Sequence, residues 1–159
     1  MRAIKAWYSE YMEELYIIYT DGGSRGNPGP AAIGVVVCDG EGNPLKSYGE
    51  KIGTTTNNEA EYRAAISALK KTKQLLGAER AKYATIEVRA DSELMVKQMN
   101  GQYKVREDML RLLFVEVWNA IQDFKRVVFK HIPREQNARA DKMLNDALDG
   151  DEAQKQALF

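Results

Sequence analysis

Apolar and polar residues follow two different periods along the chain, and the change of period separates strands from helices. Three apolar or alternating runs come first, at residues 16–20, 31–38 and 45–52, and turn-forming residues separate them. Short turns join antiparallel strands, so these runs predict a three-stranded meander. The first strand is expected to end at Asp21, because residues 22–30 hold too many Gly and Pro residues to remain extended.

Helical spacing of the apolar residues begins after the meander, where residues 54–58 can cap a helix that ends at Gly77. In chain order, the further expected elements are a helix over 59–76, a strand over 85–90, helices over 92–101 and 106–124, a strand over 127–131 and a helix over 137–148. This order, βββαβααβα, predicts an α/β fold with a five-stranded mixed sheet and helices on both faces.

Length and composition indicate one ordinary domain. The chain has 159 residues, of which 44% are hydrophobic, and this is enough for one core and too little for a second full domain. We expect an N-terminal extension over residues 1–15, a domain over 16–148 and a tail over 149–159. Lys and Arg together number 23, as do Asp and Glu, so no overall field attracts a polyanion. Binding of a nucleic acid must therefore rest on local patches.

Cysteine content and apolar runs exclude several other classes of protein. The single cysteine, Cys38, rules out an internal disulfide and a cysteine-based zinc cluster, and its apolar neighbours indicate a small core residue. No apolar run approaches the roughly 18 residues that a membrane span needs. The first fifteen residues also lack a signal-peptide pattern. These observations favour a cytoplasmic protein that does not contact a membrane, and we expect a monomer.

Four acidic residues stand out by their places in the predicted elements. Asp21 and Asp91 each follow a strand, and they lie side by side if those strands are neighbours. Glu61 shares its helical face with three alanines at the i+3, i+4 and i+7 positions, so it is expected to point toward the packed side. Asp141 falls in the first turn of the last predicted helix.

Each of these acidic residues also has an ordinary structural alternative. Asp21 could begin a hairpin turn, and Asp91 could cap the helix that follows it. Glu61 could complete a capping box with Asn58, and Asp141 could simply favour the helix dipole. Only the combination of all four favours a site, because clustered carboxylates repel one another unless cations lie between them.

Four blocks of sequence carry a resemblance to a known family. They are TDGGSRGNPGPAAIG, TTTNNEAEYRAAISAL, VRADSELMVKQMNG and HIPREQNARAD, and they lie in order between residue 16 and about residue 148. Together they resemble type 1 ribonuclease H. The resemblance implies the ribonuclease H-like fold and a four-carboxylate site that consists of Asp21, Glu61, Asp91 and Asp141.

The chemistry that the resemblance implies is two-metal phosphodiester hydrolysis. Carboxylate oxygens suit Mg²⁺, with Mn²⁺ as a substitute. Asp21 would bridge two ions, with Glu61 and Asp91 on one and Asp141 on the other. The implied partner is an RNA–DNA hybrid, whose RNA strand is recognised by its 2′-hydroxyls. The strand would be cut internally to leave 5′-phosphate and 3′-hydroxyl ends.

Further positions match the substrate contacts of the family: Asn27, Thr56, Asn57, Asn58 and Glu93. Among them, Thr56 and Asn57 match a pocket for a phosphate of the DNA strand. Arg134, in the loop over residues 132–136, is a second candidate for contacting phosphate. His131 is the only histidine, and it could be a strand-end residue satisfied by a backbone group. It also matches a family histidine that assists proton transfer or product release, a role that requires a near-neutral pKa.

Two departures from the family pattern concern substrate affinity. A Lys- and Trp-rich protrusion of many bacterial members is missing, and Lys104, Arg106 and Arg111 are the cations near its place. Glu93 stands where several relatives carry Gln. Both departures predict weak hybrid binding with few phosphate contacts. A non-catalytic module that binds hybrid or RNA, and a nuclease that also cuts double-stranded RNA, remain alternatives on the same fold.

Overall fold

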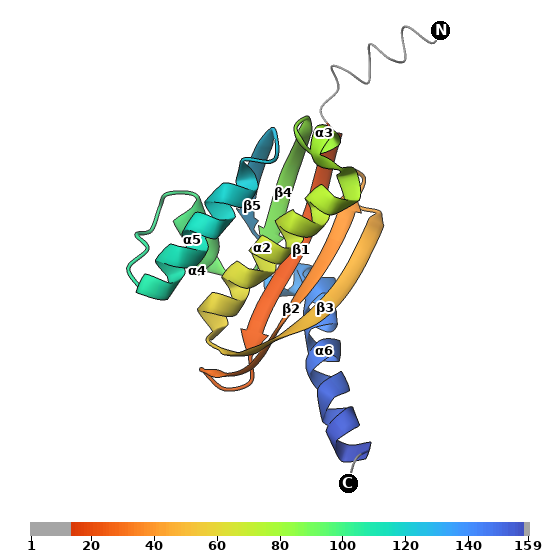
Figure 1. Ribbon diagram of the computed structural model, residues 1–159, viewed down its shortest axis with the longest axis vertical. Coiled ribbons are helices and arrows are strands. Elements are labelled where there is room, and N and C mark those ends of the chain that lie inside the picture. The colour runs from red at the N-terminus through yellow and green to blue at the C-terminus, as the bar shows by residue number, and fades with distance from the viewer. Residues whose placement is uncertain (1–13, 158–159) are drawn as a thin grey trace, which may run out of the picture.

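A single five-stranded mixed sheet organises the chain, as the sequence predicts. The computed structural model describes residues 14–157, and the side chains of residues 14–150 (Figure 1). The strands are β1 (Glu14–Ser24), β2 (Gly29–Asp39), β3 (Pro44–Thr55), β4 (Ala84–Ala90) and β5 (Arg126–His131), and their order across the sheet is β3-β2-β1-β4-β5. The first three are antiparallel, and β4 and β5 run parallel to β1.

Helices cover both faces of this sheet. They are α2 (Asn57–Leu76), α3 (Ala78–Ala81), α4 (Glu93–Met99), α5 (Asp108–Ile121), the 3-10 turn η1 (Arg134–Gln136) and α6 (Ala138–Ala157). Figure 1 shows α2 crossing one face with α5 beside it, whereas α6 runs behind β2 and β3. The expected order of elements is confirmed, and the one-turn α3 is an addition that the apolar pattern did not predict. In the described part of the chain, none of the helices combines the length and apolarity needed to cross a membrane.

Alternate residues of the central strand are buried on opposite faces of the sheet. Ile18 packs in the larger core under α2, α4 and α5, and Ile17 packs in a smaller core on the α6 side. Cys38 belongs to the smaller core and is fully buried, which confirms its prediction as a core residue. A strand that is covered on both faces cannot shift its register without exposing one apolar set. β1 is therefore a rigid support for whatever its end carries.

The expected end of the first strand at Asp21 is wrong. β1 continues to Ser24, because its pairing with β2 extends from Tyr16↔Asp39 to Ser24↔Ala31, whereas its pairing with β4 stops at Thr20↔Ala90. Antiparallel pairing with β2 thus keeps the glycine-rich segment extended. Asp21 lies inside β1, at the point where the neighbouring strand β4 has ended.

Gly22, directly after Asp21, serves helix packing. A Cβ atom on Gly22 would lie 2.2 Å from the Ala60 carbonyl oxygen and 2.5 Å from the Glu61 backbone nitrogen. Real Cβ atoms do not approach backbone so closely, so only glycine lets α2 pack against β1 at this point.

The N-terminus of α2 differs from the capping alternative considered for Glu61. Thr56 is the cap residue, and its hydroxyl accepts a hydrogen bond from the Glu59 backbone N–H at 3.2 Å. Glu59 in turn accepts a hydrogen bond from the Thr55 hydroxyl. A capping box between Asn58 and Glu61 is therefore wrong, because the helix begins at Asn57 and its cap, Thr56, lies two residues before Asn58. Glu61 has no capping role.

The outer elements extend beyond the expected bounds of the domain. β1 begins at Glu14, and α6 continues to Ala157 through most of the segment predicted as a tail. The division into residues 1–15, 16–148 and 149–159 stays a prediction, and residues 1–13 and 158–159 lie outside the described residues.

Substitution of Gly22 by alanine is expected to destabilise the protein by about 1–3 kcal/mol, because the new methyl group would collide with the α2 backbone. Gly23→Ala is the matched control, since a Cβ atom there would meet its nearest neighbours at 3.7 Å. The control is expected to change stability by less than about 0.5 kcal/mol. Urea unfolding of both variants measures the difference. Equal stability of the two variants would contradict the close contact.

Candidate active site

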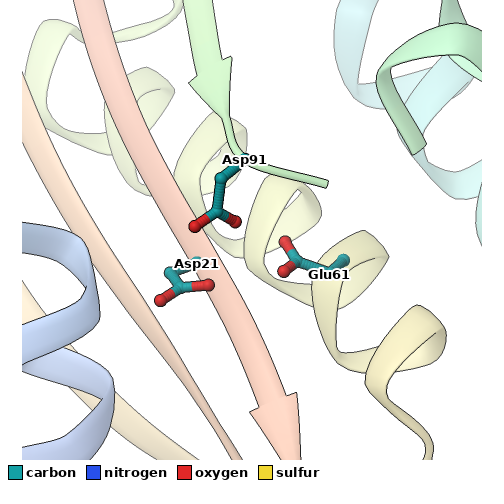
Figure 2. Close-up of side chains that lie close together, drawn as sticks. All are labelled: Asp21, Glu61 and Asp91. Atoms are coloured by element: carbon teal, nitrogen blue, oxygen red, sulfur yellow. The ribbon is translucent and has the colours of Figure 1, made fainter. Parts of the chain in front are cut away.

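Three carboxylates converge at the end of the sheet where β4 stops. Asp21, Glu61 and Asp91 each present an oxygen atom, and these oxygens lie within 4.8 Å of one another. Figure 2 shows them approaching from β1, from α2 and from the end of β4. The structure therefore brings together three of the four acidic residues that the sequence indicated.

Burial strengthens the repulsion within this cluster. Asp21 and Glu61 are 7% and 8% exposed, and Asp91 is half-buried. Burial, together with the nearby Asp91 and Asp141 carboxylates, raises the pKa of Asp21 to about 7. Burial also raises the pKa of Glu61 well above its ordinary value, with Asp21 and Asp91 adding to the effect. The cluster cannot carry its full negative charge at neutral pH without a compensating cation.

The donor atoms of the cluster fit a hard divalent cation. The Oε2 atom of Glu61 is buried without a hydrogen-bond partner, although buried carboxylate oxygens ordinarily have one. All three residues offer carboxylate oxygen, which is the ligand type that Mg²⁺ and Mn²⁺ prefer. A cation among Asp21, Glu61 and Asp91 would satisfy the Glu61 oxygen and offset the repulsion.

Asp141 lies beside this cluster on the α6 side. It occupies the first turn of α6 and is close enough to Asp21 for a side-chain hydrogen bond to contribute to the raised pKa of Asp21. It stands outside the group of three whose oxygens lie within 4.8 Å. All four acidic residues nevertheless line one open cleft of about 610 Å³, together with Asn58, His131 and Arg134.

His131 is placed at the mouth of the cleft by strand pairing. It is the last residue of β5, opposite Ala90 in the ladder, and its exposed ring brings Nε2 within 3.3 Å of the Asp91 backbone carbonyl. The contact with a backbone group fits the structural interpretation of this residue, and its role in proton transfer or product release stays a prediction. Arg134 lies in η1, lines the same cleft and lowers the pKa of Asp91, which burial raises more strongly.

Three of the expected substrate contacts, Asn27, Thr56 and Asn57, lie where the glycine-rich turn meets the start of α2. The Asn57 backbone N–H donates to Asn27 Oδ1 at 3.0 Å, and Asn57 Oδ1 accepts from the Ser24 backbone N–H at 2.9 Å. Thr56 lies next to them as the helix cap. These bonds hold the turn between β1 and β2 against α2. Asn27, Thr56 and Asn57 therefore form one continuous edge beside the cleft.

Glu93 is exposed in the first turn of α4 and is paired. Lys97 Nζ lies 2.6 Å from Glu93 Oε1 and 5.0 Å from the centroid of the Tyr103 ring. Charge pairing with Lys97 lowers the pKa of Glu93. The repulsion of a phosphate backbone that was expected from Glu93 is therefore partly offset.

Asn137 is a buried residue beside the acidic cluster that the apolar pattern did not single out. It is 1% exposed, and its Nδ2 donates to the Thr20 carbonyl at 2.9 Å. In the sequence it stands only as the residue where the last helix was expected to begin, and α6 in fact begins one residue later. Its partner in β1 lies 117 positions away, so no local pattern could have identified the contact.

Comparisons with known proteins agree with this geometry. Residues 19–147 match the family described as Reverse transcriptase-like. Over 131 residues the chain is 41% identical to Ribonuclease HI of Halobacterium salinarum. This match covers 82% of this chain and 63% of that protein. It is 40% identical over 134 residues to the Bifunctional protein Rv2228c of Mycobacterium tuberculosis, covering 84% of this chain and 35% of that protein. The chain thus spans less than two thirds of the length of these two relatives.

A solved structure shares both the fold and much of the sequence. The crystal structure of LC11-RNase H1 in complex with an RNA/DNA hybrid matches this chain with a TM-score of 0.81 and 49% sequence identity. The match covers 85% of this chain and 97% of that one. It confirms the ribonuclease H-like fold that the four sequence blocks implied.

The raised pKa of Asp21 predicts a pH-dependent stability of the metal-free protein. The unfolded carboxyl titrates near 3.9, so its contribution to stability is full below about pH 4 and is lost as pH rises through about 7. Asp21→Asn is expected to lose less stability than wild type between pH 5 and pH 8, because it lacks this group. Denaturant unfolding in EDTA at both pH values measures the difference, and the same pH dependence in both proteins would contradict it.

Proposed function

The chain belongs to the type 1 ribonuclease H family, and on that premise we propose that it hydrolyses the RNA strand of RNA–DNA hybrids. The observation that carries the proposal is the convergence of Asp21, Glu61 and Asp91 in an open cleft, with a buried Glu61 oxygen that lacks a partner. LC11-RNase H1, at 49% identity, was crystallised with such a hybrid. All four acidic residues come from one chain, so a monomer would suffice.

Two Mg²⁺ ions, or Mn²⁺ in their place, are the proposed cofactors. Asp21, Glu61 and Asp91 would hold one ion, and Asp141 with a shared Asp21 would hold the second. When bound, such ions activate water as a nucleophile and stabilise both the attacking and the leaving oxygen of a phosphoryl displacement. The proposed products carry 5′-phosphate and 3′-hydroxyl ends.

Residues around the cleft would orient the hybrid and handle its protons. Arg134 supplies a cation beside Asp91, where a phosphate of the RNA strand would lie. His131, at the mouth of the cleft, would exchange a proton with water or with the leaving 3′ oxygen. Thr56 and Asn57 would receive a phosphate of the DNA strand at the N-terminus of α2, where backbone N–H groups favour anions.

Selection of RNA over DNA would rest on polar side chains that meet 2′-hydroxyls. Asn27 Oδ1 already accepts from Asn57, so Asn27 would act as a donor through Nδ2. Asn58 lines the cleft, and the Glu93 carboxylate would accept a hydrogen bond from a 2′-hydroxyl or a base edge. A hydroxyl can donate and accept, and DNA lacks it at this position.

Labelled RNA–DNA, RNA–RNA and DNA–DNA duplexes, incubated with Mg²⁺, test the proposed activity. Wild type is expected to cut the RNA of the hybrid, and Asp21→Asn is expected to lower the rate at least about a hundredfold, since it removes a shared ligand. Glu79→Gln, in α3, is the matched control and is expected to cut at the wild-type rate. Hybrid cleavage by Asp21→Asn at the wild-type rate would contradict the proposed mechanism. Hybrid binding without cleavage in Mg²⁺ or Mn²⁺ would instead indicate a non-catalytic module, and RNA–RNA cleavage would widen the substrate range.

The salt dependence of hybrid binding tests how few phosphates the protein contacts. Residues 100–107, between α4 and α5, carry only Lys104 and Arg106 as cations. We expect the logarithm of the hybrid-binding affinity to decrease linearly with the logarithm of the salt concentration. The slope is expected to be smaller in magnitude than about 4. Arg134→Ala is expected to reduce that magnitude by about 1, whereas Lys82→Ala, far from the cleft, leaves it unchanged.

Fluorescence anisotropy of a hybrid bound to Asp21→Asn measures this slope between about 50 and 200 mM salt. A slope of roughly twice the expected magnitude would show that many more phosphates are neutralised.

A further inference from the structure

One buried asparagine contacts three of the elements that carry the four acidic residues of the cleft. Asn137 connects η1 to α6 and is 1% exposed. Burying an amide costs free energy unless its polar atoms are bonded. The Nδ2 atom of Asn137 is bonded, whereas its Oδ1 atom is buried without a partner. The contacts of the residue show what it supports. These contacts lead to β1, to the end of β4 and to the first turn of α6.

The first contact replaces strand pairing where β4 ends. The parallel ladder between β1 and β4 stops at the pair Thr20↔Ala90, and Asn137 Nδ2 donates to the Thr20 carbonyl at 2.9 Å. Thr20 directly precedes Asp21 in β1. The amide therefore fixes the backbone next to Asp21, the carboxylate that the two ions are proposed to share. At this point β4 has ended and no longer pairs with β1.

The second and third contacts reach the other two elements. The Asn137 side chain also lies close enough to the Asp91 carboxylate to lower its pKa, which burial raises. An amide nitrogen has two N–H groups, so the bonds to Thr20 and Asp91 can form together. The Asn137 backbone carbonyl accepts from the Asp141 N–H at 3.1 Å, which is the first backbone bond of α6 and does not depend on the side chain.

We propose that Asn137 is the positioning residue whose side chain holds the carboxylates of β1 and of the end of β4 in place for a divalent cation. The proposal deepens the proposed function and rests on it for the identity of the site. Replacement of a residue that does not bind the metal but orients its ligands typically weakens metal binding by about 10–100-fold. Asn137 itself supplies no carboxylate, and the effect of its side chain passes through Asp21 and Asp91.

Two variants and one control separate positioning from general stability. Asn137→Ala removes the side chain, and Asn137→Leu keeps most of its volume but removes the donors. Gln98→Leu is the matched control, because Gln98 is 5% exposed and bonds the Tyr62 hydroxyl and the Lys104 carbonyl, away from the cluster. All three variants are expected to lower the melting temperature in EDTA, since each leaves buried groups without partners.

Calorimetric titration of the free proteins with Mn²⁺ and with Mg²⁺ provides the deciding measurement. Both Asn137 variants are expected to bind metal at least about tenfold more weakly, and Gln98→Leu as tightly as wild type. On a hybrid, the Asn137 variants are expected to lower kcat, with partial rescue by more Mg²⁺, while KM changes less than about threefold. A folded Asn137→Leu that binds metal like wild type would overturn the proposal and leave Asn137 a purely structural residue.

The titration also distinguishes this proposal from the proposed function. If wild type fails to cut hybrids but the Asn137 variants lose metal affinity, the nuclease activity is wrong and the positioning role stands. If wild type cuts hybrids and the Asn137 variants keep both metal affinity and kcat, the positioning role is wrong and the activity stands.

Discussion

Mutual repulsion of clustered carboxylates is the constraint on which the rest of the structure depends. Asp21, Glu61 and Asp91 bring oxygens within 4.8 Å of one another, and two of the three are almost fully buried. Such a cluster disfavours folding, so its geometry must be imposed by packing elsewhere. The double-faced burial of the sheet provides that support, because β1 cannot move without disturbing the cores on both of its sides.

The fold satisfies this constraint by assembling the site from elements of different length and direction. β1 runs four residues beyond the end of its ladder with β4, so Asp91 leaves the sheet beside Asp21. Gly22 lets α2 approach closely enough to bring Glu61 in from one side. α6 brings Asp141 from the opposite face. Four short sequence segments, far apart in the chain, thus meet at one edge.

Local patterns predicted the elements correctly, and they predicted the contacts between elements less well. Period-2 and period-3.6 spacing gave the strands and helices, and the alanines on its helical face placed Glu61 on the buried side. The extension of β1 past Asp21 was missed, because a glycine-rich run has turn propensity whereas pairing with β2 is a tertiary effect. Asn137 was missed for the same reason, since its side chain bonds a carbonyl that lies 117 positions away in the sequence.

Charge at the cleft explains how a chain with no net charge and no basic protrusion would bind a polyanion. Without metal, the cleft carries four carboxylates, and Arg25 at its rim is paired with Asp149 at 2.5 Å. Arg134 alone does not offset the four carboxylates. Bound divalent ions would reverse the local potential and attract the phosphate backbone. Metal and hybrid would therefore favour each other's binding, and by linkage the effect must be equal in both directions. The proposed metal ions would then supply the positive charge that a basic protrusion would otherwise carry on its side chains.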